Sequence, residues 1–148
     1  MFKKIIAAID GSEMSEKATE AAILMAKEQG GQVTLLHVMK DVVIPPYAMG
    51  DMAYVTREYD EDINEAIRKD AEELLNKGKA KAEADGLAVT TVLRKGDAAR
   101  EIINYTKENR TDLIVIGSRG LGAFKEIMLG SVSHKVSQLA DCPVLIIK

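Results

Sequence analysis

Five short runs of strand-forming residues, separated by segments with helical spacing, constrain the fold of this chain more than any other feature. Residues 5–9 and 113–116 are continuously apolar, and residues 32–39, 87–95 and 144–147 are rich in branched side chains. Continuous apolar runs of this length are typical of strands buried on both faces of a parallel sheet. The run over residues 87–95 alternates more than the others, which favours an edge position.

Helical spacing fills the four intervals between these runs. Apolar residues recur every three or four positions over residues 15–29, 60–85 and 98–109, and again from Ser131 onward. Glycines at 30 and 86 follow the first two segments, where glycine commonly ends a helix. The inner positions predicted for the last helix are Val132, Val136, Leu139 and Ala140.

This alternation predicts an α/β fold: a Rossmann-like open twisted five-stranded parallel sheet, order 3-2-1-4-5, with helices on both faces. Residues 1–148 are interpreted as a single domain, and the last run, 144–147, lies at the edge opposite residues 87–95. In this order the carboxyl ends of the first and fourth strands are neighbours. A crevice opens where the winding reverses, and ligands of such sheets bind there.

Residues 40–59 show no sustained period of either kind. They contain Pro45, Pro46, Gly50 and three of the four tyrosines. A connection of this length is typical of a lid, a binding loop or a partly helical excursion. A surface loop that tucks its aromatic side chains onto the body is the favoured interpretation.

Composition argues against several classes of protein. Twenty basic and twenty-three acidic residues are interspersed without a long basic run, which disfavours nucleic-acid and anionic-membrane partners. A single cysteine excludes an internal disulfide framework, and the two histidines lie in no zinc-ligand pattern. The apolar runs are too short for a secretory signal or for a span of about 18 residues. A cytoplasmic location is expected.

A glycine-rich stretch follows the fourth run, spaced as Gly117-x2-Gly120-x9-Gly130-Ser131. Glycine lets backbone amides approach an anion closely, and a helix starting at Ser131 adds donors and a favourable dipole. The chain has no Walker A sequence, and Lys125 interrupts a Gly-x-Gly-x-x-Gly fingerprint. The stretch therefore predicts a phosphate cradle after the fourth strand, beside Asp10 at the end of the first.

This spacing resembles the signature of the universal stress protein family, in particular its ATP-binding branch. The likeness extends over the whole chain: the turn at Asp10, the Leu-Leu-His-Val run ending at Val38, the Leu-Gly-Ser-Val-Ser run ending at Ser133, and Cys142-Pro143-Val144 before the last strand. The resemblance implies ATP as the ligand, with Mg²⁺ or Mn²⁺ possible beside it, and a role in stress response.

The resemblance also assigns residues to the parts of the nucleotide. Backbone groups of Val38 meet the adenine, and Ala8, Ile9 and Asp10 meet the adenosine. The phosphates fall to the glycine-rich loop and the helix start, namely Gly117, Ser118, Arg119, Gly120, Leu121, Gly122, Ala123, Gly130, Ser131, Val132 and Ser133. The protein supplies no metal site alone, although Asp10 lies near any nucleotide-bound cation.

Several polar residues keep two interpretations. Asp10 either contacts a ribose hydroxyl or a cation, which the resemblance favours, or caps the first helix. Arg119 and Lys125 either neutralise terminal phosphates or are solvated. His37 is interpreted as a packed, hydrogen-bonded core histidine. His134 is expected to face solvent, and Cys142 is expected to be a small buried residue.

Three functions stay open at this point. The leading one is an ATP-binding switch or regulator. A slow ATPase or phosphotransferase needs a metal and a positioned nucleophile, neither of which the sequence displays. A nucleotide-free dimeric interaction module fits poorly with an intact glycine signature. A homodimer is predicted through the last strand, Val144–Ile147, because an apolar edge strand invites pairing with another chain.

Overall fold

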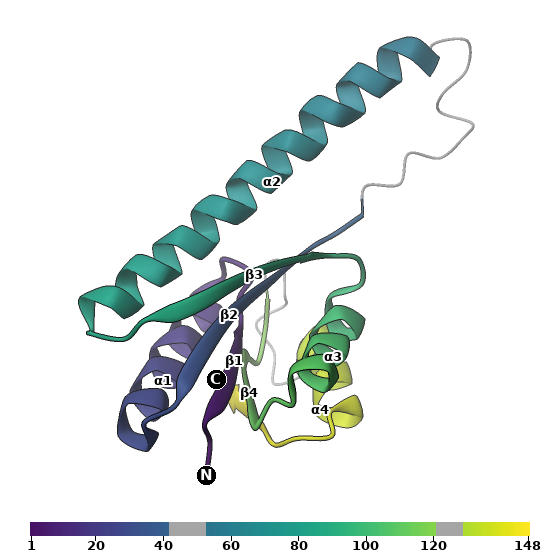
Figure 1. Ribbon diagram of the computed structural model, residues 1–148. Coiled ribbons are helices and arrows are strands. Elements are labelled where there is room, and N and C mark those ends of the chain that lie inside the picture. The colour runs from purple at the N-terminus through teal and green to yellow at the C-terminus, as the bar shows by residue number, and fades with distance from the viewer. Residues whose placement is uncertain (42–52, 121–128) are drawn as a thin grey trace.

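The computed structural model describes residues 1–41, 53–120 and 129–148, and shows strands and helices in strict alternation (Figure 1). The elements in chain order are β1 Lys4–Ala8, α1 Glu13–Gln29, β2 Gln32–Met39, α2 Ala53–Ala84, β3 Val89–Lys95, α3 Ala98–Asn109, β4 Leu113–Gly117, α4 Ser131–Leu139 and β5 Val144–Ile147.

The five strands form one parallel sheet in the order β3-β2-β1-β4-β5, as predicted. β1 lies at the centre, where Ala8 is paired with Leu36 of β2 on one side and with Ile116 of β4 on the other. Helices α1 and α2 cover one face, and α3 and α4 cover the opposite face (Figure 1). The winding therefore reverses between β1 and β4, which places a crevice at their carboxyl ends.

Each face of the sheet has its own buried cluster. Residues of the central strands alternate between the two faces: Ile5 and Ala7 pack against α1, whereas Ile6 and Ala8 pack against α3 and α4. β1 and β4 are buried along almost their whole length, in agreement with their continuous apolar sequences. The small side chains of Ala18, Ala22 and Ala26 let α1 lie close to the sheet.

The amino-terminal edge of the sheet is fixed by Asp112. One carboxylate oxygen, Oδ2, accepts hydrogen bonds from the backbone N–H groups of Lys3 at 3.0 Å and Lys4 at 2.8 Å. These two bonds hold the pKa of the Asp112 carboxyl below its usual value, since they stabilise the charged form. The start of β1 is thereby tied to the start of β4.

Two predicted features differ in the structure. The helix expected over residues 60–85 is α2, and it begins earlier, at Ala53. No glycine or proline lies between residues 53 and 60, so nothing in the sequence stops the helix there, even though the apolar period is absent. The prediction that Leu139 faces inward is wrong. Leu139 is the last residue of α4 and is 58% exposed, whereas Val136 is fully buried.

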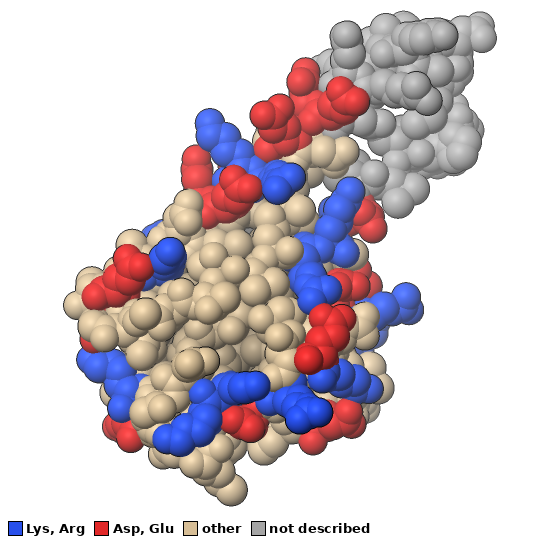
Figure 2. All heavy atoms as spheres, viewed as in Figure 1, with Lys and Arg blue, Asp and Glu red and all other residues tan. Residues whose placement is uncertain are grey.

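The interpretation of residues 40–59 as a surface loop is wrong for residues 53–59, which belong to α2, and residues 42–52 lie outside the described residues. In the parts of the chain that are described, no helix is both long and apolar enough to cross a membrane. Basic and acidic side chains are interspersed around an uncharged central area on the face seen in Figure 2.

Candidate functional site

A pocket of about 900 Å³ lies at the carboxyl ends of β1, β2 and β4. This volume falls within the range of about 300–1,000 Å³ that small-molecule sites occupy. The starts of α1, α3 and α4 surround it, through Ser12, Ala98 and Ser131 respectively. A helix N-terminus favours an anion through its dipole and its unpaired backbone N–H groups, and α4 is the one of these three helices that starts without a side-chain cap.

One wall of the pocket is the turn between β1 and α1. Asp10 Oδ1 accepts a hydrogen bond from the Ser12 backbone N–H at 2.9 Å and another from the Ser12 hydroxyl at 2.5 Å. Ser12 in turn caps α1, because its Oγ accepts from the Ser15 N–H at 3.2 Å. Asp10 is therefore not the cap itself: its carboxylate lines the pocket and orients the residue that caps the helix.

Two glycines let β4 and its following loop approach this turn. A methyl group added at Gly117 would lie 2.7 Å from Met14 Cβ and 2.9 Å from the Met14 carbonyl carbon, closer than atoms of folded proteins approach. A methyl group added at Gly120 would lie 2.5 Å from Asp10 Oδ2. The glycines bring the loop after β4 against α1 and against the Asp10 carboxylate.

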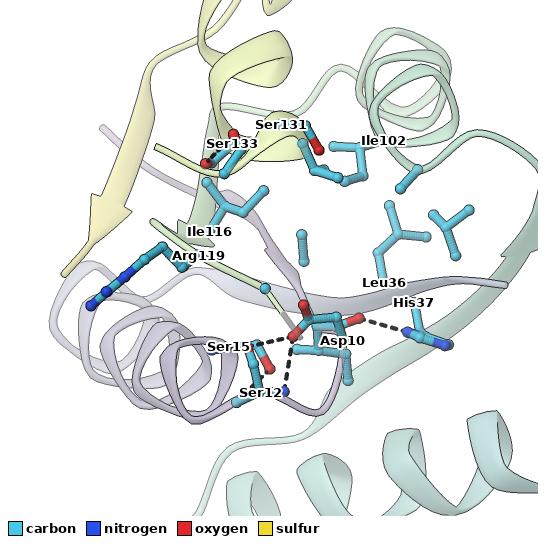
Figure 3. Close-up of a pocket in the computed structure, with 18 of the residues that line it drawn as sticks. Asp10, Ser12, Ser15, Leu36, His37, Ile102, Ile116, Arg119, Ser131 and Ser133 are labelled. Carbon is cyan, nitrogen blue, oxygen red and sulfur yellow. Dashed lines mark hydrogen bonds between the residues drawn. The ribbon is translucent and has the colours of Figure 1, made fainter. Parts of the chain in front are cut away.

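The opposite wall is the start of α4. Gly130 caps this helix without a side-chain hydrogen bond. The Ser133 hydroxyl donates to the carbonyl oxygens of Ser118 at 2.9 Å and Gly130 at 3.0 Å, and the Gly130 N–H donates to Ser118 O at 2.7 Å. The loop after β4 is thus fastened to the helix start, and Ser131 faces the pocket on the side opposite Asp10 (Figure 3).

Apolar side chains form the remaining wall. Leu36, Ile102 and Ile116 come from β2, α3 and β4 and belong to the buried cluster on the α3 and α4 face (Figure 3). A site with one apolar wall and two polar walls, of which the start of α4 favours an anion, suits a ligand that combines a flat apolar group with a charged group.

The structure brings most of the predicted site residues to this pocket. Those that line it are Ala8, Ile9, Asp10, Val38, Gly117, Arg119, Gly120, Gly130, Ser131, Val132 and Ser133. Ser118 is not brought to the pocket: it is buried, its N–H donates to Ile147 O, and its carbonyl accepts from Gly130 and Ser133. Leu121, Gly122, Ala123 and Lys125 lie outside the described residues.

Other lining residues were not predicted. They are Ser12, Ser15, Leu36, His37, Met39, Lys40, Ile67, Ala98, Ile102, Ile116 and Leu129. The strand order contained a signal for Ser12 and Ala98, because every turn that follows a parallel strand lies at the same edge of the sheet. No such signal exists for Ile67, which reaches the pocket from within α2.

The structure also shows the environments of the two histidines, of Cys142 and of Arg119, for which the sequence made predictions. His37 is hydrogen-bonded as predicted, through Nδ1 to Ile9 O at 2.6 Å, but it is half-buried and lines the pocket instead of the core. His134 is exposed, as expected, whereas Cys142 is only half-buried, and burial raises the pKa of its thiol. The Arg119 side chain extends away from Asp10 and the serines (Figure 3).

Among the side chains that the structure describes, which lie in residues 1–41, 61–120 and 129–148, no three of the His, Cys, Asp and Glu type gather as a metal site.

Comparisons with known proteins show the same fold. A family model described as "Universal stress protein family" matches residues 1–148. The universal stress protein YxiE of Bacillus subtilis is 44% identical, over 100% of both chains. Among solved structures, the universal stress protein UspA from Lactobacillus plantarum matches with a TM-score of 0.86 at 21% identity, covering 99% of this chain and 98% of that one. A universal stress protein family protein from Arabidopsis thaliana, solved with AMP bound, matches with a TM-score of 0.70 at 23% identity, covering 99% and 91%.

Proposed function

This chain belongs to the universal stress protein family, and on that premise we propose that it binds ATP in the pocket between β1 and β4. It serves as a nucleotide-responsive regulator in the stress response. The observation that carries the proposal is the placement of Gly117, Gly120 and the N-terminus of α4 around the polar side of the pocket, beside an apolar wall in a pocket of suitable size.

The pocket divides the nucleotide between its walls. The adenine lies against Leu36 and Ile102 and meets the backbone of Val38, since a flat aromatic base gains most from the apolar wall. The phosphates lie at Ser131 and at the amides of the loop after β4. An adenine nucleotide is named for the Arabidopsis relative, where it is AMP, and this supports the ligand class.

Asp10 accepts a hydrogen bond from the ribose or lies beside a cation that accompanies the phosphates. A Mg²⁺ or Mn²⁺ ion carried in with ATP adds to the neutralisation of phosphate charge, for which the described lining offers the cationic side chains of Lys40 and Arg119. Because Ser12 fixes one oxygen of Asp10, the carboxylate is oriented before any ligand arrives.

Three further features belong to the same proposal. Residues 1–148 act as one nucleotide-binding domain in the cytoplasm. The active form is a homodimer paired along β5, an edge strand whose four aliphatic residues are all partly exposed. ATP changes the exposure of a surface that protein partners recognise, through its contacts with the glycine-rich loop after β4.

Binding is tested by calorimetry with ATP on the wild type and on Ser131→Ala, with Ser137→Ala as the matched control. Ser137 lies on the same helix, but its hydroxyl donates to His134 O on the exposed side. Removing a hydroxyl that donates to a phosphate should weaken binding about five- to tenfold. Ser137→Ala should bind ATP like the wild type.

Hydrogen exchange supplies a second measurement. Saturating ATP should slow exchange of the Ser131 and Val132 amides, which line the phosphate end of the pocket. Absence of binding heat, together with no adenine nucleotide released from freshly purified protein, would instead indicate a nucleotide-free interaction module. Steady turnover of radiolabelled ATP would indicate a phosphohydrolase.

A further inference from the structure

The hydrogen-bond ladder between β1 and β2 ends one bond before the point to which the two backbones could continue it. The last pair is Ala8 with Leu36, and the Ile9 N–H still donates to Leu36 O at 2.9 Å. A parallel ladder continued by one step would use the Val38 N–H as donor to Ile9 O. The structure has no such bond between these two described residues.

The imidazole of His37 takes the place of that missing donor. Its Nδ1 lies 2.6 Å from Ile9 O. A carbonyl oxygen only accepts hydrogen bonds, so Nδ1 carries the proton in this contact and neutral His37 is the Nδ1–H tautomer. Figure 3 shows the ring approaching the end of β1 beside Asp10.

Because His37 replaces Val38 as the donor to Ile9 O, the backbone N–H and C=O of Val38 stay available to a ligand in the pocket. Backbone groups of successive strand residues point to opposite neighbours, so Leu36 and Val38 face β1 while His37 faces β3, where it pairs with Leu93. Because β1 ends at Ala8, the N–H and C=O of Val38 face the pocket that Val38 lines. A bond from Val38 to Ile9 would have closed this part of the crevice.

We propose that His37 is a positioning residue for base recognition: by satisfying the Ile9 carbonyl, it leaves the Val38 backbone free to read the edge of the base. This inference rests on the proposed binding of ATP. An adenine edge presents a ring-nitrogen acceptor beside an amino donor, which matches one N–H and one C=O of the same residue. Guanine carries two acceptors, N7 and O6, along one edge, and matches this pair less well.

The first experiment compares His37→Leu with His37→Asn. The Asn side-chain amide places a donor where Nδ1 stands, so it keeps the bond to Ile9 O, whereas Leu removes it. His37→Leu should bind ATP about five- to tenfold more weakly, and its preference for ATP over GTP should shrink. His37→Asn should behave like the wild type. Inorganic tripolyphosphate should bind all three proteins equally, since the phosphate end is unchanged.

The second experiment needs no nucleotide and separates this inference from the proposed function. In the free wild type, NMR should show fast exchange of the Val38 amide and a proton on His37 Nδ1, whereas His37→Leu should slow Val38 exchange by completing the ladder. A protected Val38 amide in the free wild type would overturn the inference. So would equal ATP binding by the wild type and His37→Leu, or equal weakening in folded His37→Leu and His37→Asn. A wild type that binds no ATP while its Val38 amide exchanges fast would overturn the proposed function, and with it the role in base recognition, but would leave the hydrogen bond from His37 to Ile9 O and the unpaired Val38 amide in place.

Discussion

Gly117 and Gly120 stand three residues apart in sequence but meet different kinds of neighbour. At Gly117 the obstacle to a side chain is the backbone and Cβ of Met14, inside α1, which cannot move without shifting the helix. At Gly120 the obstacle is the end of the Asp10 side chain. The first glycine therefore serves the fold, and the second serves the orientation of a pocket carboxylate.

Substitution by alanine should separate these two roles. Gly117→Ala should lower the free energy of unfolding by about 1–3 kcal/mol, the usual cost of overpacking a rigid site. Gly120→Ala should leave stability nearly unchanged and weaken ATP binding by about 1.5 kcal/mol, or roughly tenfold, because it displaces the Asp10 carboxylate. Urea denaturation and calorimetry measure the two quantities.

The test compares which of the two substitutions lowers the free energy of unfolding more and which weakens ATP binding more. If Gly120→Ala destabilised the fold more than Gly117→Ala, the contact with Met14 would not be the tighter constraint. If Gly120→Ala bound ATP normally, the position of Asp10 would have no bearing on binding.

At the scale of residues, the sequence predicted the position of Asp10, Gly117, Gly120 and Gly130 at the pocket, but it misplaced Ser118 and His37. Glycine spacing is recognisable because the chemistry of close approach restricts those positions to one residue type. Ser118 lies between the two glycines Gly117 and Gly120 in sequence. Its N–H nevertheless binds Ile147 of β5 and its carbonyl binds the start of α4, so it holds these two elements together. His37 was predicted as a core residue because it alternates with Leu35, and alternation does not reveal where a neighbouring strand ends.

At the scale of elements, the site depends on where three helices begin. The ends of β1, β3 and β4 are each followed by a helix whose first residues reach the pocket. In α3 the start is fixed by Asp97, whose Oδ2 accepts from the Arg100 N–H at 3.0 Å. Ala98 and Ile102 of this helix line the pocket, so its cap supports the apolar wall from outside.

Removing the Asp97 cap should lower the free energy of unfolding and leave ATP affinity nearly unchanged. Asp97→Ala should lower the free energy of unfolding by about 1 kcal/mol, since the first turn of α3 loses a side-chain acceptor. Asp97→Asn should retain most of the wild-type stability, because the Asn side-chain oxygen can accept the same hydrogen bond. ATP affinity of the folded protein should change by less than about twofold, because Asp97 is not a lining residue. A large loss of affinity in Asp97→Asn would show that the carboxylate charge acts on the ligand directly.

Helix and strand positions were predictable to within a residue or two wherever turn residues mark both ends. β2, α3 and β5 occupy the predicted ranges, because glycine, Asp97 and proline delimit them. The start of α2 was not predictable, since Met52 is not a capping type of residue and residues 53–59 show no apolar period in the sequence. Leu139 was misplaced because α4 ends at that residue and the chain turns away at Ala140.

At the scale of the whole molecule, strand order followed from the burial pattern of the sequence. The most continuously apolar runs form the centre, and right-handed crossovers then allow few arrangements. The two edges are unequal. β3 carries threonines and ends in Arg94 and Lys95, whereas β5 is Val-Leu-Ile-Ile without a charge. Charged edges resist pairing with other chains, so we expect a second copy to pair along the uncharged β5.

A lysine placed on each edge tests this asymmetry. Ile146→Lys puts a charge in the middle of β5, where pairing with the β5 strand of a second copy would bury it, so the variant should sediment as a monomer at micromolar concentration. Thr90→Lys adds the same charge at an exposed position of β3 and should leave the dimer intact. Circular dichroism establishes that both variants are folded. A wild type that is monomeric by light scattering, or a dimer lost in Thr90→Lys and kept in Ile146→Lys, would contradict pairing along β5.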